Sequence, residues 1–156
     1  MTQLDIAREP IGAATVAEMA SSCTLVYIPR RSFPDAWPAL APLAQSVIDR
    51  SGGRISEGTL FQSVLEGSQH IWTVWDGNEI RALVGAEVGF APTGLKICTV
   101  NFATGRDSHE WLHLLDEIET WAREIGCGKM EMWARKGWAR KLPDYRMTHV
   151  LLEKDF

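Results

Sequence analysis

Residues 71–90 read IWTVWDGNEIRALVGAEVGF, and this stretch contains two strands joined by a tight turn. Ile71 to Trp75 is rich in aromatic and β-branched residues, and Asp76-Gly77-Asn78 is a typical hairpin turn. From Glu79 to Phe90, apolar residues recur at every second position, as in a strand with one buried face. The stretch therefore predicts an antiparallel hairpin within a larger sheet.

The residues before this hairpin predict one more strand and several helices. Leu25 to Ile28 is β-rich, and a short helix is expected at 13–20. Apolar residues from Phe33 to Arg50 recur at intervals of three and four, which indicates an amphipathic helix that Pro42 is expected to divide. A further helix is expected to begin at Ser56 and to end before Gly67.

The residues after the hairpin predict strand, helix, strand, short helix and strand. The expected strands are Leu95–Phe102, Lys129–Trp133 and Thr148–Leu152, and the short basic helix is Gly137–Leu142. The long helix at 111–125 has one apolar stripe and one acidic face. Asp107 and Glu110 have the spacing of a capping box, and Gly126 stands where a terminal glycine belongs.

Length and composition favour one domain, 1–156, with a net charge of −4. The segment 129–146 has six basic and two acidic residues, a local charge of +4, which indicates either a solvated face or a site for a phosphate or an acidic partner. Three widely spaced cysteines fit reduced thiols in the cytoplasm, and no metal site is predicted. No signal peptide and no membrane-spanning stretch is predicted.

The order hairpin, central strand, long helix, strand resembles the GNAT superfamily of acyltransferases. The most similar parts are DGNEIRALVG in the hairpin and WAREIGCGKMEMW at the step from helix to strand. The resemblance implies an α/β (α+β) fold with a mixed, mostly antiparallel central sheet and helices on both faces. The tail WAREIGC…ARKGWARKL…Y…LLEK is similar more narrowly to small GNAT-like proteins of tailed phages and prophages.

The resemblance also implies a site for acetyl-CoA or another acyl-CoA after the central strand. The family's loop usually reads [QR]-x-x-G-x-[GA], which assigns cofactor binding to Phe102, Ala103, Gly105, Arg106 and Ser108. This chain departs from that pattern, since Phe102 stands at the Gln or Arg position and Asp107 at the second small residue. Asp107 and Glu110 are expected to cap the helix, which would fill the phosphate site from within the chain.

The family's catalytic roles fall on Glu87 as general base and Tyr145 as general acid. Each has a plain alternative, a solvent-facing carboxylate for Glu87 and a packing tyrosine for Tyr145. Trp138, among Arg135, Lys136 and Arg140, is a candidate contact for a protein partner, and its alternative is packing of the short helix on the sheet.

Two functions remain open at this point. The first is an N-acyltransferase that moves an acetyl or acyl group from acyl-CoA to a small-molecule or protein amine. The second is a non-catalytic virion or assembly protein of a phage, acting through protein contacts in the particle or as a homo-oligomer in the host cytoplasm. Nucleic-acid binding through the basic segment is less favoured because the whole chain is acidic.

Overall fold

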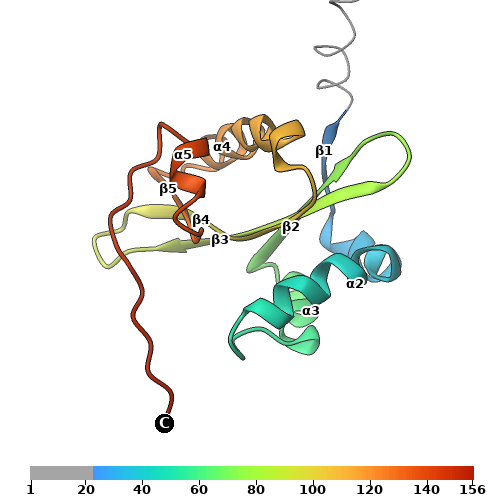
Figure 1. Ribbon diagram of the computed structural model, residues 1–156, viewed down its shortest axis with the longest axis horizontal. Coiled ribbons are helices and arrows are strands. Elements are labelled where there is room, and N and C mark those ends of the chain that lie inside the picture. Colours follow the sequence, from blue (N-terminus) through green and yellow to red (C-terminus); the bar gives the residue numbers. More distant parts are fainter. Residues whose placement is uncertain (1–22) are drawn as a thin grey trace, which may run out of the picture.

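The computed structural model describes residues 23–156, which form a five-stranded sheet between two layers of helices (Figure 1). The expected helix at 13–20 lies outside the described residues. The strands follow one another across the sheet in chain order: β1 (Thr24–Tyr27), β2 (Gln69–Trp75), β3 (Ile80–Phe90), β4 (Lys96–Gly105) and β5 (Lys129–Met132).

Every neighbouring pair of strands is antiparallel except β4 and β5, which run parallel. The predicted hairpin is confirmed, with Trp72 opposite Val84 and Thr73 opposite Leu83. The connection from β4 to β5 crosses over one face of the sheet and carries α4 (Leu115–Glu124). The mixed, mostly antiparallel sheet with helices on both faces is therefore as expected.

The helices on the second face are α2 (Phe33–Arg50) and α3 (Glu57–Glu66), preceded by a short turn, η1 (Arg30–Ser32). The expectation that Pro42 divides α2 was wrong, because α2 is one continuous helix. Pro34, Pro38 and Pro42 are spaced by four and all are exposed. The carbonyls that lose a hydrogen bond therefore face water, which satisfies them.

The ends of α3 are as predicted. Ser56 caps its first turn by accepting a hydrogen bond from the Thr59 amide, and Gly67 ends it in the left-handed conformation.

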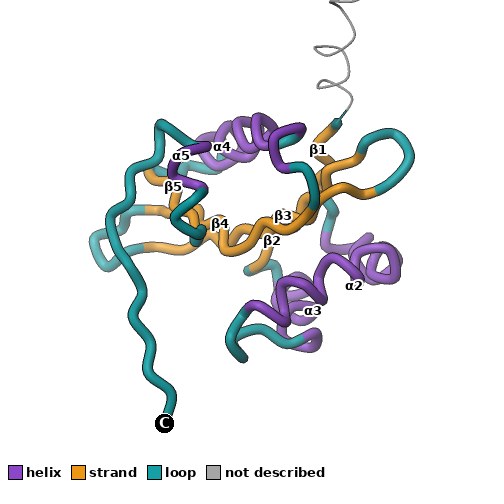
Figure 2. The backbone as a smooth tube through the Cα atoms, viewed as in Figure 1, coloured by secondary structure: helices purple, strands orange, loops and turns teal. Residues whose placement is uncertain are grey.

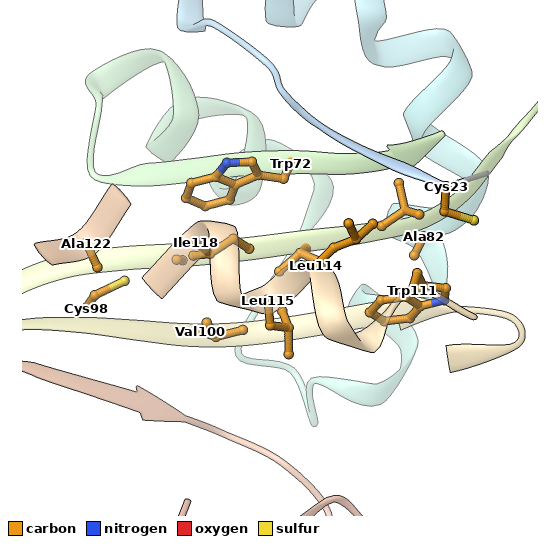
Figure 3. Packing of buried hydrophobic residues seen from close by; sticks show 13 residues of the cluster. Cys23, Trp72, Ala82, Cys98, Val100, Trp111, Leu114, Leu115, Ile118 and Ala122 are labelled. Atoms are coloured by element: carbon orange, nitrogen blue, oxygen red, sulfur yellow. The ribbon is translucent and has the colours of Figure 1, made fainter. Parts of the chain in front are cut away.

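Each face of the sheet has its own apolar core. The α4 face packs Trp111, Leu114 and Ile118 onto strand residues such as Val84 and Cys98 (Figure 3). Side chains alternate along β3, so that Ala82, Val84 and Ala86 face α4 while Leu83 faces the opposite layer. That second core joins the sheet to α2 and α3; its buried members are Phe33, Leu40, Ala44, Val47, Leu60, Val64, Ile71, Leu83 and Phe102.

The last part of the chain differs from the prediction. After α5 (Trp138–Lys141), residues 146–156 form neither helix nor strand, and they run past the sheet, where Glu153 contacts Arg54 (Figure 2). The expected strand at Thr148–Leu152 was wrong, because no neighbouring strand in the described part of the chain pairs with this segment. Within residues 23–156, no helix has the length and hydropathy needed to cross a bilayer.

Candidate functional site

Strands β4 and β5 pair over only part of their lengths. Their parallel pairing runs from Ile97 opposite Lys129 to Val100 opposite Met132. Beyond Val100, β4 continues to Gly105, whereas the chain after β5 turns away into α5. A bulge lies at the same point, because Gly85 of β3 pairs with Phe102 and the next residue, Ala86, pairs with Val100. The bulge bends β4 where it separates from β5.

A pair of side-chain amides spans β3 beside this bulge. Gln69 of β2 and Asn101 of β4 exchange two hydrogen bonds, of 3.1 Å and 2.8 Å, across the strand between them. They can meet because Gly85 has no side chain: a Cβ there would lie 2.7 Å from Gln69 Nε2 and 2.2 Å from the Phe102 ring. The bulge, the glycine and the amide pair form one arrangement on the α2/α3 face.

The turn that follows β4 is fixed to the end of the hairpin. Gly105 lies so close to β3 that a Cβ would be 2.4 Å from the Arg81 carbonyl oxygen. The Arg106 amide donates to that same oxygen at 3.2 Å. The Arg106 carbonyl in turn accepts a hydrogen bond of 2.8 Å from the indole of Trp111, which is buried. The turn is therefore held at both ends.

The predicted capping box at Asp107 and Glu110 was wrong. The Asp107 side chain makes no capping hydrogen bond, and its backbone is left-handed with φ of 54°. Two short turns, η2 (Ser108–Glu110) and η3 (Leu112–Leu114), precede α4, so that the regular helix begins only at Leu115. Carboxylates that cap a helix need extended backbone at the capping position, which the left-handed conformation of Asp107 does not provide.

Asp107 instead faces a neighbouring arginine. Its Oδ2 lies 3.7 Å from an Arg81 guanidinium nitrogen, and the same guanidinium contacts Asp76 at 2.5 Å and Glu79 at 3.8 Å. Two backbone amides of the hairpin turn, from Glu79 and Asn78, and then Arg81 itself, lower the pKa of Asp76 to about 2. Arg81 thus offsets part of the negative charge beside the turn.

The turn after β4 leaves several donors for an anion. The amides of Asp107, Ser108 and His109 make no turn or loop hydrogen bond to another group within residues 23–156. Lys141 of α5 donates to the Ser108 hydroxyl at 2.9 Å, and Arg106, which is exposed, contacts Glu79 at 3.1 Å. Consecutive amides with basic side chains around them are suited to phosphate oxygens. We call residues 105–109 with Lys141 the β4–α4 turn site.

Tyr145 lies on the α4 face in a shallow hollow beside this turn. The hollow is bounded by α4 and the segment 141–145, and its lining includes Leu112, Leu115 and Asp116. The Tyr145 hydroxyl donates to Glu119 Oε1 at 2.7 Å. Burial, followed by the hydrogen bond to Glu119, raises the Tyr145 pKa well above its usual range. The phenol is therefore protonated at neutral pH.

Glu87 lies on the other face of the sheet. It is exposed, and it pairs with Gln69 of β2 and Thr99 of β4. Its neighbour Ala86 belongs to the core under α4, so the Glu87 side chain points to the α2/α3 side. The structure thus places Glu87 and Tyr145 on opposite faces, and they do not meet.

The other residues expected at the site divide into two groups. Gly105, Arg106 and Ser108 lie in the β4–α4 turn site. Phe102 is only 7% exposed and its ring packs among α2 and α3, so only its backbone is accessible to a ligand. Ala103 is partly buried against the core under α4.

Trp138 packs on the core rather than projecting outward. It is partly buried, and its ring centroid lies 6.4 Å from that of Trp111. Trp138 therefore packs on the core, and its contact with a protein partner stays a prediction. Cys98 and Cys127 are free thiols, and no group of His, Cys, Asp or Glu residues within 23–156 is arranged to hold a metal ion.

Sequence reasoning missed four contributors to this region: Gln69, Arg81, Asn101 and Lys141. Asn101 gave a usable signal, because it is the one side-chain amide in a mostly apolar strand. Lys141 was seen only as part of the basic segment, and its contact with Ser108 spans 33 residues.

Several solved acetyltransferases share this fold. An aminoglycoside acetyltransferase from an uncultured soil metagenomic sample, in complex with sisomicin, has a TM-score of 0.66 at 12% identity, over 88% of this chain and 99% of that one. A ribosomal-protein-alanine N-acetyltransferase from Brucella melitensis biovar Abortus 2308 has a TM-score of 0.60 at 14% identity, over 85% and 99%. A GNAT family acetyltransferase from Staphylococcus aureus has a TM-score of 0.59 at 11% identity, over 86% and 98%.

No protein-family model matches the chain, and no curated protein matches it in sequence. The likeness to solved structures therefore rests on three-dimensional arrangement alone, and it establishes the class of fold. The chain has the GNAT fold, as the hairpin and the helix-to-strand step predicted. The narrower resemblance to phage-encoded proteins stays a prediction.

Proposed function

We propose that this protein is an N-acyltransferase that takes an acyl group from acyl-CoA and transfers it to an amine. The observation that carries the proposal is the β4–α4 turn site, where three consecutive amides, Arg106 and Lys141 surround one turn beside diverging strands. The altered loop sequence was unfavourable for this function, because Asp107 was expected to cap the helix and so to occupy the phosphate site. Its side chain faces Arg81 instead and makes no capping hydrogen bond to the amides of the turn.

The residues present fit the pyrophosphate of a coenzyme A. Backbone amides and basic side chains are the usual donors to phosphate oxygens, and the amides need no particular side chain to act. Gly105 allows the close approach of the turn to β3, and Ser108 is held by Lys141. When bound, acyl-CoA would supply the activated acyl thioester.

The opposite placement of Glu87 and Tyr145 suits a transfer through the opening between β4 and β5. An amine that enters from the α2/α3 side would lose a proton to Glu87, and its nitrogen would form the new C–N bond at the thioester carbonyl carbon. As the C–S bond breaks, Tyr145 would protonate the sulfur from the α4 side. The Tyr145 phenol is protonated at neutral pH, as this step requires, and its hydroxyl would turn from Glu119 to the sulfur.

Two solved acetyltransferases of like fold indicate which acceptor amines to test first. Two proteins of like fold are named as acetyltransferases of an aminoglycoside and of a ribosomal-protein alanine. The aminoglycoside and the alanine are both amines that accept an acetyl group. Sisomicin and a peptide with an N-terminal alanine are therefore suitable first substrates.

Calorimetric titration with acetyl-CoA tests the donor site. We expect micromolar affinity for the wild type and loss of binding in Arg106→Glu, because that change reverses a charge beside the phosphates. Arg50→Glu in the last turn of α2 is the matched control, since it changes the net charge equally on the other side of the sheet. Absence of binding to the wild type at millimolar acetyl-CoA would contradict the proposal and favour a role through protein contacts alone.

A further inference from the structure

Strand β5 is the last strand of the sheet, and its outer edge is open. In the described part of the chain, no strand lies beyond it. An edge strand directs alternate N–H and C=O groups outward, where they can pair with another strand. Met130 and Met132 are half-buried toward α4, whereas Lys129 and Glu131 are exposed on the other face.

The segment 147–153 has the sequence of a strand but pairs with no strand of the described structure. Its apolar side chains are exposed, from 53% for Met147 and 66% for Val150 to 72% for Leu151 and 89% for Leu152. Four exposed apolar residues within six positions are uncommon in a segment that stays in water, and they typically mark a contact surface.

The segment passes its own sheet without joining it. Just before it, Tyr145 is bonded to Glu119 on the α4 side, and at its end Glu153 is paired with Arg54 in the loop between α2 and α3. These two contacts lie on opposite sides of the sheet, so the chain crosses from one side to the other (Figure 1). In this path its backbone groups and apolar side chains remain available to a second molecule.

We propose that residues 148–153 pair as an antiparallel strand with the outer edge of β5 in a second copy of this chain. The proposal is independent of acyl transfer. Each molecule carries both halves of the contact, the unpaired segment 148–153 and the open edge of β5. In two copies related by a twofold axis, each segment can therefore pair with the β5 edge of the other copy.

One register of this pairing matches both charge and polarity. With Glu153 opposite Lys129, opposite charges face each other, and Leu152 and Val150 fall beside Met130 and Met132. The two apolar side chains then extend the core under α4, and Leu151 stands opposite Glu131 on the other face. A shift by one residue would turn Val150 and Leu152 away from that core, which disfavours it.

Cross-linking in trans tests the pairing and its register. Two differently tagged chains, one with Glu131→Cys and the other with Leu151→Cys, are coexpressed in a Cys127→Ser background and mildly oxidised. Directly opposite residues of an antiparallel pair come within reach of a disulfide. We expect a cross-linked heterodimer as the main product, and at least severalfold less when Lys129→Cys replaces Glu131→Cys.

Other outcomes of the cross-linking experiment would overturn the proposal. Absence of a heterodimer would exclude this pairing between chains. A third variant carries Glu131→Cys and Leu151→Cys in the same chain. If it formed an internal disulfide while the mixed chains formed no heterodimer, the segment would pair with β5 of its own chain.

The mass in solution provides a second measurement. Light scattering after gel filtration is expected to give about twice the chain mass of 17.4 kDa for the wild type and the chain mass itself for Leu152→Asp. Because Leu152 is 89% exposed, this change leaves the fold intact, which a thermal melt verifies. Leu65→Asp, at an exposed leucine of α3, is the matched control and is expected to stay dimeric. A monomeric wild type, or a dimeric Leu152→Asp, would refute the inference.

Discussion

The two faces of the sheet are covered in different ways. On the α2/α3 face, the helices seal apolar residues against the strands around Phe102, and the partly buried amide pair of Gln69 and Asn101 lies close against Gly85. On the α4 face, the core is equally well buried beneath Ile118, but the cover ends at the β4–α4 turn and a hollow beside Tyr145. The difference indicates that the α2/α3 face fixes the shape of β4, whereas the α4 face carries the candidate site.

The sealed face should respond most strongly to substitution at Gly85. In Gly85→Ala, the new methyl group would lie within 2.4 Å of two Phe102 ring atoms, and that ring is buried. We expect a loss of about 1–3 kcal/mol in the free energy of unfolding, as for other overpacked cores. Chemical denaturation measures it.

Gly89→Ala provides the control for Gly85→Ala in the same strand, because a Cβ at Gly89 meets nothing within 4 Å. If both variants lost the same stability, the close packing around Gly85 would not be the cause.

The amide pair should be the next most sensitive feature. Asn101→Ala leaves the buried amide of Gln69 without its partner in β4, and an unsatisfied buried polar group costs about 1–3 kcal/mol. Thermal or urea unfolding would show the loss. The double variant Gln69→Leu with Asn101→Leu removes both polar groups and should recover part of it, and no recovery would contradict this account.

On the open face, Tyr145→Phe should affect catalysis far more than stability. The change removes one hydrogen bond to Glu119, which is worth about 1 kcal/mol. If Tyr145 is the proton donor, acyl transfer should fall by about 10²–10⁴-fold with little change in acetyl-CoA affinity. Thiol release during turnover and calorimetry separate these two effects. Unchanged turnover would assign Tyr145 to packing alone.

The smallest expected effect on stability is that of Asp107→Asn. Asn tolerates the left-handed backbone as well as Asp does, and the contact of Asp107 with Arg81 is half-exposed. The free energy of unfolding should therefore change by less than about 0.5 kcal/mol. Removing the charge should tighten acetyl-CoA binding several-fold, because one negative charge near the phosphates costs about 1 kcal/mol. Asp35→Asn in α2 is the control, and equal tightening there would point to net charge instead of position.

Most of the sheet could be predicted from the sequence, because the alternation in β3 and the turn at Asp76 are local signals. The β4–α4 turn could not, since the conformation of Asp107 is coupled to Arg81, which comes from the preceding hairpin. The segment at 148–152 has a strand-like pattern, but a strand forms only where a partner edge is provided, and local pattern does not supply one. The resemblance implied Glu87 and Tyr145 as candidate catalytic residues, but the sequence did not show that they lie on opposite faces of the sheet.

The most direct test of the donor site is an NMR titration of the 15N-labelled protein with acetyl-CoA, in which the amide chemical shifts are monitored. The largest shift changes are expected at the amides of Asp107, Ser108 and His109, with smaller changes around Lys141. Shifts confined to other parts of the molecule, or none at millimolar acetyl-CoA, would contradict the assignment of the β4–α4 turn as the phosphate site.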